Sequence, residues 1–146
     1  MEDRYRTDID DLWSAITDPK RLARWVARVD GDLRLGGVFR ASFTSGWEGP
    51  GRIDMCEPPR RLLVTLSPGE DEQTEIEVEL VPDGDVTRLV IEERGLPLDE
   101  AAVHGAGWQV HVEDLGAYLA GRPGTDWRTR WTELMPGYRE QEHRPG

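Results

Sequence analysis

The feature that most constrains this chain is a long helical segment near its C-terminus, predicted between Asp99 and Gly121. Asp99 suits the N-cap, and Gly121 followed by Pro123 suits the end. Apolar or small residues recur every three or four positions, which places them on one helix face. A helix of this length must bury such a face against a large apolar surface. The stripe consists of Ala101, Gly105, Trp108, Val112, Leu115 and Leu119.

A predicted β-sheet supplies that surface. In the segment 74–81, Ile76, Val78 and Leu80 alternate with glutamates, which indicates a strand with one buried and one solvated face. Consecutive strands joined by short turns favour an antiparallel meander over the βαβ units of a parallel sheet. The other strands of the meander are predicted over 38–44, 52–57, 61–67 and 86–93.

Two short helices are predicted before the meander. Asp8 suits the N-cap of a helix over 9–17, with its apolar residues on one face. Asp18-Pro19 suits the start of a second helix that ends near Val26, because aspartate is a good N-cap and proline fits the first helical position. A short strand over 3–7 is expected ahead of both helices.

A last helix is predicted over 126–141, where Trp127, Trp131, Leu134 and Tyr138 stand at helical spacing. We expect it to pack on the outside of the fold. No repeat, low-complexity tract or linker divides the sequence, so a single domain over 1–146 is expected, with a core over 4–121 and a helical extension over 122–146. The predicted class is α+β: a curved antiparallel sheet wrapped around a long C-terminal helix, with an extra terminal helix.

Composition excludes several classes of function. The net charge is −11 and no basic stripe is visible, which argues against nucleic acid and anionic membranes as partners. The apolar runs are far shorter than the ~20 residues of a membrane span. No secretory signal follows the charged first residues, and Cys56 has no second cysteine to pair with, so a cytoplasmic location is expected.

Four short motifs occur in an order that resembles a known family. They are the segment Leu12–Pro19 followed by Leu22 and Trp25, the turn Leu35–Phe39, the corner Glu57–Leu62, and the pair Gly107-Trp108. In this order, over about residues 4–121, they are similar to proteins related to the activator of heat-shock protein 90 ATPase, homologue 1. That family belongs to the START-like (SRPBCC) superfamily. The first strand is shorter than the usual one, and the tail after Gly121 extends the basic pattern.

The resemblance implies the helix-grip (START/Bet v 1-like) fold, with a hydrophobic cavity between sheet and helix. It implies no chaperone activation, since most members, which are bacterial, bear the name by similarity alone. Known activities of the wider superfamily are lipid and polyketide binding, aromatic cyclisation and ligand sensing. No cofactor is implied.

The expected cavity is lined by aromatic and aliphatic side chains, with the loop 45–51 as its gate. Strand parity places Arg40 outside, opposite Phe39, and leaves Glu93 as a polar group that could face the cavity. The predicted ligand-binding residues are Trp25, Phe39, Phe43, Trp47, Met55, Leu66, Ile76, Trp108, Val112 and Leu115.

The histidines of the long helix are the remaining candidates for chemistry. His104 and His111 are seven residues apart, about 10 Å along a helix, which is too far for one metal ion. No metal site is predicted. No catalytic residue is predicted: a surface position is expected for His104, and use as a general acid or base near the cavity mouth is the alternative.

Three functions stay open. The first is non-catalytic binding of a small hydrophobic or aromatic molecule. The second is a cyclase- or hydrolase-like enzyme for a polyketide-type substrate, using His104. The third is a co-chaperone-like interaction module or a homodimer, with an exposed apolar patch around Trp127 and Trp131.

Overall fold

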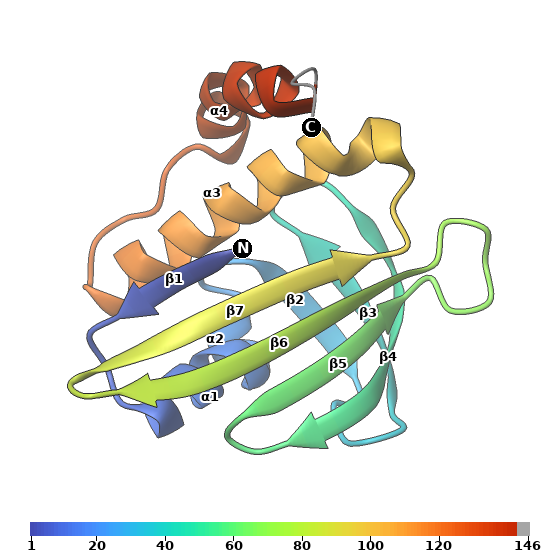
Figure 1. Cartoon of the computed structure of the whole chain (residues 1–146). Coiled ribbons are helices and arrows are strands. Elements are labelled where there is room, and N and C mark those ends of the chain that lie inside the picture. The colour runs from blue at the N-terminus through green and yellow to red at the C-terminus, as the bar shows by residue number, and fades with distance from the viewer. Residues whose placement is uncertain (143–146) are drawn as a thin grey trace.

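The computed structural model describes residues 1–142 and has one seven-stranded antiparallel sheet that curls around a long helix (Figure 1). The strand order is β1-β7-β6-β5-β4-β3-β2, so strands β2 to β7 follow one another as a meander, which confirms the prediction. The strands are β1 (Glu2–Tyr5), β2 (Ala27–Gly31), β3 (Val38–Phe43), β4 (Glu48–Glu57), β5 (Arg61–Leu66), β6 (Thr74–Asp83) and β7 (Val86–Arg94).

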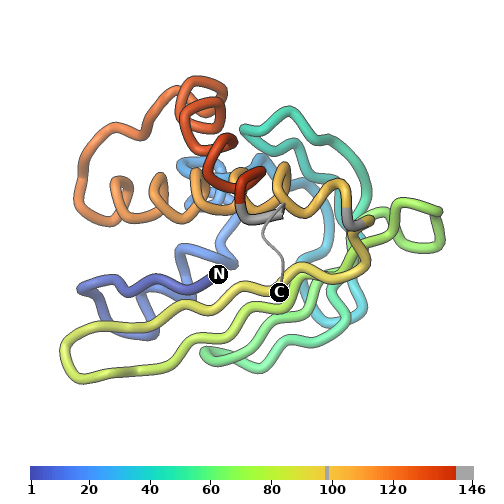
Figure 2. The backbone as a smooth tube through the Cα atoms, turned by 45° about the horizontal axis from the view of Figure 1, so that its top comes forward, coloured from blue at the N-terminus to red at the C-terminus, as the bar shows by residue number. Residues whose placement is uncertain are grey.

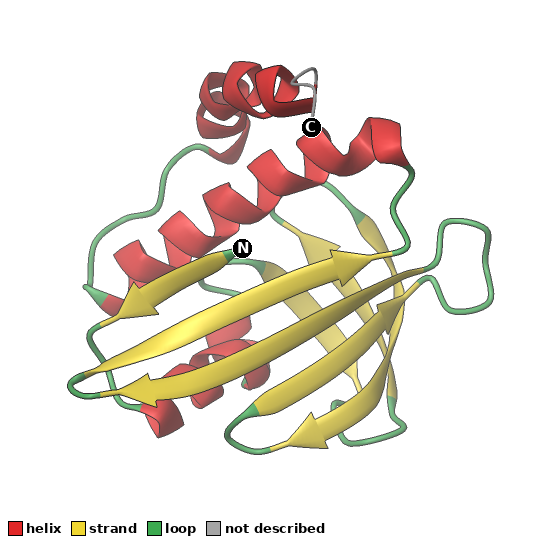
Figure 3. Cartoon of the chain, viewed as in Figure 1, coloured by secondary structure: helices red, strands yellow, loops and turns green. Residues whose placement is uncertain are grey.

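Two short helices precede the meander and two longer ones follow it, and the last of these lies on the far side of the long helix from the sheet (Figure 3). The Asp8 and Asp18 side chains accept hydrogen bonds from the backbone N–H groups of Asp11 and Lys20, as predicted for N-caps. Asp99 is not a cap, because it lies in a short 3-10 turn, η1 (Leu98–Glu100). The α-helices are α1 (Ile9–Thr17), α2 (Pro19–Leu22), α3 (Ala101–Leu119) and α4 (Trp127–Glu142).

Two element boundaries differ from the prediction. The second helix ends at Leu22, and the chain then enters strand β2, which the sequence pattern did not indicate. Strand β4 begins at Glu48, so most of the predicted loop 45–51 belongs to a strand. Only a tight turn remains between β3 and β4, with Gly46 in the left-handed region at φ 99°.

A β-bulge corrects the predicted direction of Met55. The register between β4 and β5 shifts between Ile53 and Met55, and one extra residue reverses the side-chain alternation beyond it. Ile53 remains buried, but Cys56 rather than Met55 then packs against the core. Met55 is therefore not on the cavity side of the sheet as predicted.

Helix α3 is buried on two sides rather than one. Val112 and Leu115 face the sheet as predicted, and the Tyr5 hydroxyl donates to the Val112 carbonyl oxygen at 2.9 Å. The N-terminal half also carries α4, which lies along its outer side (Figure 2). Ala102 and Ala106 pack against Met135 there.

The prediction that the first residues of the stripe face the sheet was therefore wrong. Ala101 is exposed, and Gly105 lies under the ring of Tyr138 in α4. Trp127 and Trp131 stack at 5.9 Å between ring centroids, and Trp131 Nε1 donates to the Val103 carbonyl oxygen at 3.1 Å. Both tryptophans thus hold α4 on α3. Within residues 1–142, no helix combines the length and apolar character needed to cross a membrane.

Two glycines of α3 test this packing. A Cβ at Gly116 would meet the Tyr5 ring at 3.5 Å, an ordinary contact, so Gly116→Ala should stabilise the fold by about 0.5–1 kcal/mol through helix propensity. A Cβ at Gly105 would lie 2.9 Å from the Tyr138 ring, which must shift. Gly105→Ala should therefore be less stable than Gly116→Ala by about 1 kcal/mol or more in urea denaturation. Equal gains would contradict the docking of α4 described above.

Candidate functional site

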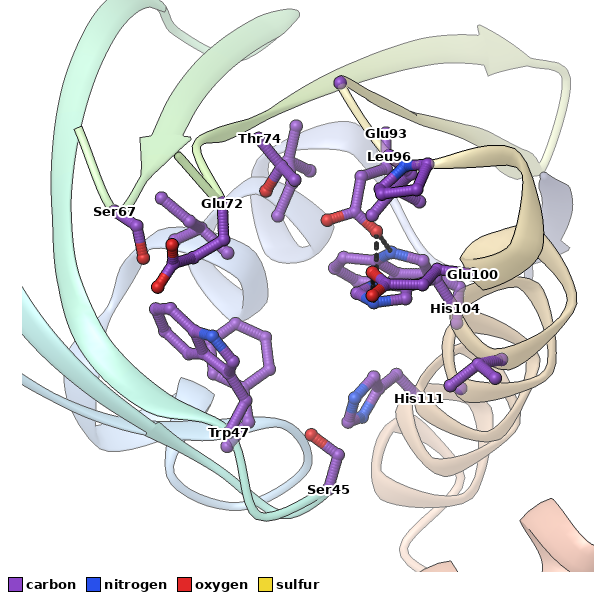
Figure 4. A pocket seen from close by; sticks show the side chains of 18 of the residues that line it. Ser45, Trp47, Ser67, Glu72, Thr74, Glu93, Leu96, Glu100, His104 and His111 are labelled. Carbon is purple, nitrogen blue, oxygen red and sulfur yellow. Dashed lines mark hydrogen bonds and ion pairs between the residues drawn. The ribbon is translucent and has the colours of Figure 1, made fainter. Parts of the chain in front are cut away.

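A cavity of about 600 Å³ opens between the N-terminal half of α3 and one end of the sheet (Figure 4). Its volume suits a small organic ligand. Four segments and α4 build it: the β3–β4 turn, the β5–β6 turn, the β7–α3 connection and the inner side of α3. Its polar and aromatic lining side chains include Ser45, Trp47, Asp71, Glu72, Glu93, Glu100, His104, Trp108, His111 and Trp127. We call this space the outer cavity.

A second, smaller cavity of about 170 Å³ lies deeper, between the sheet and helices α1 and α2. Its walls are almost entirely apolar, and they include Trp13, Trp25 and Phe39. We call it the inner cavity. The two cavities have four lining residues in common, so they adjoin each other across these side chains: Phe43, Leu66, Ile76 and Trp108.

A buried carboxylate connects the sheet to α3 at the wall of the outer cavity. The Glu93 side chain is only 7% exposed, and Oε1 lies 3.0 Å from both His104 Nδ1 and Trp108 Nε1. Glu93 faces inward because it continues the alternation of buried residues in β7. Burial opposes the charge on Glu93, but the hydrogen bonds from His104 and Trp108 outweigh it, and the pKa of Glu93 lies below its usual value. The hydrogen bond to Glu93 raises the pKa of His104 against the opposing effect of burial.

His111 lies about one turn after Trp108 on α3 and has different surroundings. The residue is 4% exposed, and its Nδ1 has no hydrogen-bond partner among the side chains that the structure describes. Aromatic rings surround it, with centroid distances of 5.8 Å to Phe43, 5.5 Å to Trp108 and 5.9 Å to Trp127. Burial lowers the pKa of His111 to about 4, so the imidazole is neutral near pH 7. Asp114, three residues further along α3, accepts hydrogen bonds from the backbone N–H and the hydroxyl of Thr125 and not from His111.

The rim of the outer cavity is acidic. Asp71, Glu72 and Glu100 line it, and no lysine or arginine is among the described residues that do so. Figure 4 shows Glu72 across the cavity from Glu100 and His104. In the part of the chain that the structure describes, no group of three or more His, Cys, Asp or Glu side chains is placed to hold a metal ion.

Most residues predicted to line a ligand cavity lie at one of these two. Met55 is excluded by the bulge, and Val112 and Leu115 are buried in the core but line neither cavity. Arg40 is exposed, as expected. The residues that do line a cavity are Trp25, Phe39, Phe43, Trp47, Leu66, Ile76 and Trp108.

Several lining residues were not predicted. Trp13 and Trp127 are not among the predicted ligand-binding residues, yet they line the inner and outer cavities respectively. His111 stands three residues after Trp108 on α3, which is helical spacing and could have placed it beside that tryptophan. For Glu93 the sequence signal is strand parity, because this residue continues the alternation of buried side chains in β7. No sequence signal marked Cys56, because the bulge that turns it inward leaves no mark in the alternation pattern.

The Glu93–His104 pair predicts a specific titration behaviour. The pKa of His104 is raised above its ordinary value of 6.5, so the stabilisation is fully present below pH 6.5 and is lost as the pH rises through the folded-state pKa. The pKa of Glu93 is depressed below 4.5, so its contribution is present above pH 4.5 and is lost as the pH falls through the folded-state pKa. The pair should stabilise the fold most between these two values.

Glu93→Gln should therefore lower the pKa of His104 toward 6.5, as followed by NMR titration of the imidazole signals. Glu100→Gln is the matched control, since its carboxylate lies 3.8 Å from His104 Nε2 and is 53% exposed. It should lower the pKa of His104 less. A larger effect of Glu100→Gln would show that Glu93 is not the principal partner.

Solved structures with this architecture are known. The crystal structure of CalU16 from Micromonospora echinospora is 31% identical, with a TM-score of 0.83 over 98% of this chain and 86% of CalU16. DynU16, a protein of the dynemicin biosynthetic locus, is 29% identical, with a TM-score of 0.77 over 86% of this chain and 49% of DynU16. A Bordetella parapertussis protein at 24% identity and a TM-score of 0.80, over 97% of this chain and 84% of that protein, shares the fold.

No curated protein matches the chain. The family model described as activator of Hsp90 ATPase homolog 1-like protein matches residues 6–120. That range runs from just after β1 through the whole of α3, so it contains strands β2 to β7 and every cavity-lining residue except Trp127. The chain belongs to the activator of Hsp90 ATPase homolog 1-like family and has its helix-grip fold.

Proposed function

We propose that the protein binds a small, uncharged, largely aromatic molecule in these adjoining cavities, without catalysing a reaction. The observation that carries this proposal is the outer cavity of about 600 Å³, which shares Phe43 and Trp108 with the apolar inner cavity beside it. Apolar pockets with a few convergent polar groups are typical of small-molecule sites.

Apolar burial supplies the driving force. Removing about 200 Å² of ligand surface from water contributes about 5 kcal/mol, at about 25 cal/mol per Å². Part of this is offset by the freedom that the ligand loses on binding. The aromatic side chains Trp47, Trp108 and Trp127 offer flat surfaces at which ring systems pack well.

The charges at the rim favour uncharged or cationic ligands over anions. Asp71, Glu72 and Glu100 surround the entrance without an opposing lysine or arginine among the described lining residues. A negative potential at a cleft of this kind lowers the local concentration of anions. The net charge of −11 acts in the same direction.

The solved relatives support a link to natural-product chemistry. DynU16 comes from the dynemicin biosynthetic locus and is 29% identical in sequence to this chain. The present chain spans about half of DynU16. A polyketide-type aromatic compound is therefore a reasonable ligand class to test first.

The neutral dye N-phenyl-1-naphthylamine tests the proposal by fluorescence titration. The wild-type protein should bind it saturably with one site. Leu66→Trp places a large ring where the cavities meet and should weaken binding at least tenfold. Leu35→Trp is the matched control, because Leu35 is 66% exposed, and it should bind like wild type.

The anionic analogue 1-anilinonaphthalene-8-sulfonate adds a sulfonate to the same ring system. It should bind at least several-fold more weakly than the neutral dye, with the difference shrinking at high salt.

Both variants must keep the thermal transition of a folded protein. Absence of saturable binding by wild type, or equal binding by Leu66→Trp and Leu35→Trp, would contradict the proposed site.

One observation favours a second candidate, an acid–base enzyme of the cyclase or hydrolase type. Glu93 holds His104 Nδ1 at 3.0 Å, which is how a carboxylate orients a catalytic imidazole. The Glu100 carboxylate lies 3.8 Å from His104 Nε2, so it partly blocks the nitrogen that would act on a substrate. We therefore rank the enzyme after the binding protein.

Hydrolysis of 1-naphthyl acetate separates the enzyme from the binding protein. An enzyme should lose about 10²-fold or more of its rate in His104→Gln, since general acid–base catalysis contributes about that much. A binding protein should show the same background rate for wild type and variant. The homodimer stays a prediction, and light scattering tests it directly.

A further inference from the structure

His111 is a polar side chain whose presence the packing of the fold does not explain. It is 4% exposed, it lines the outer cavity, and its Nδ1 is buried without a partner among the described residues. A buried polar group left without a hydrogen bond costs about 1–3 kcal/mol. Phenylalanine would suit the rings of Phe43, Trp108 and Trp127 without that cost.

The ring is surrounded by groups that cannot complete its hydrogen bonds. Its ring contacts are to aromatic side chains, and burial keeps it neutral near pH 7 because its pKa is about 4. Oε1 of Glu93 already accepts from Trp108 and lies against His104 Nδ1. His111 therefore remains available to a molecule in the cavity.

The charges around the cavity indicate which imidazole nitrogen carries the hydrogen. Four carboxylates line the cavity with His111, and they place a negative potential on the cavity side of its ring: Asp71, Glu72, Glu93 and Glu100. That potential favours the tautomer whose N–H points into the cavity. Nδ1 is buried and has no partner among the described residues, so the hydrogen then sits on Nε2.

The cavity is reached through Nε2 rather than Nδ1. Nδ1 is inaccessible, so Nε2 is the ring nitrogen left to face the space that His111 lines (Figure 4). Asp71, Glu72, Glu93 and Glu100 can only accept hydrogen bonds while ionised. A buried hydrogen-bond donor in the same cavity as these carboxylates would select a ligand that carries a hydrogen-bond acceptor.

Resting on the proposed binding function, we propose that His111 Nε2 donates a hydrogen bond to a carbonyl oxygen of the ligand. The ligand class is thereby narrowed to uncharged aromatic ketones and quinones. The apolar ring system packs among the aromatic walls, and the carbonyl group lies at His111. The serine and threonine hydroxyls of the cavity can donate or accept, so they adapt to either end of such a ligand.

Two naphthalene probes of similar shape test this assignment by calorimetry: 1-acetonaphthone, which carries a carbonyl, and 1-ethylnaphthalene, which does not. Wild type should bind the ketone about tenfold more tightly, as one net hydrogen bond allows. His111→Phe should bind both within about twofold of each other. Its melting temperature should equal or exceed that of wild type, because the unpartnered nitrogen is gone.

Imidazole ¹⁵N NMR of the wild-type protein provides a second readout that needs no variant. The chain has three histidines, so the signals can be assigned by substitution. His111 should show the tautomer with hydrogen on Nε2, and this nitrogen should shift when the ketone is added. A hydrogen on Nδ1 would overturn the donor assignment.

The outcomes separate the two proposals. Equal binding of both probes by wild type, or a ketone preference that survives in His111→Phe, would overturn the role of His111 and leave the binding function standing. Binding of neither probe by folded wild type would overturn both.

Discussion

The carboxylate of Glu93 joins the sheet to the long helix, and the shape of the cavity depends on that connection. It stands at the end of β7 and accepts hydrogen bonds from Trp108 and His104 of α3, each at 3.0 Å. Trp108 is thereby fixed at the place where the outer and inner cavities meet. A hydrogen-bonded carboxylate resists displacement better than an apolar contact, because leaving it buried and unpaired would be costly. The wall of the cavity is thus held by directional bonds as well as by packing.

The remaining walls are arranged around this joint at some cost in stability. A fold selected only for stability would fill a space of about 600 Å³ with side chains, since protein interiors are otherwise close-packed. It would also not keep His111 Nδ1 and Trp127 Nε1 buried without partners. Helix α4 closes the outer side of α3, and Trp127 reaches from it to the cavity wall. The C-terminal extension is therefore part of the candidate site and not an appendage to the fold.

The sequence was a good guide where a single period governed the segment. The alternation of Ile76, Val78 and Leu80 located β6, and the motifs from Leu12 to Trp108 indicated the family and its fold. It was a poor guide where tertiary contacts override local pattern. Strand β2 lacks a strong alternation, the bulge after Ile53 exchanges Met55 for Cys56, and Gly105 faces a helix whose position no periodicity encodes. The missing partner of His111 is likewise a property of the assembled cavity, which pattern reading cannot supply.

Indole NMR signals test the central claim, that the adjoining cavities are a ligand site, most directly. The chain has six tryptophans, so their N–H groups report separately on the inner cavity, the outer cavity and the α3–α4 contact. On addition of N-phenyl-1-naphthylamine, the account predicts saturable shifts for Trp47 and Trp108, which line the outer cavity. The Trp131 signal, whose N–H donates to the Val103 carbonyl oxygen, should change least. Shifts confined to Trp131, or no saturable shift at Trp47 and Trp108, would contradict it.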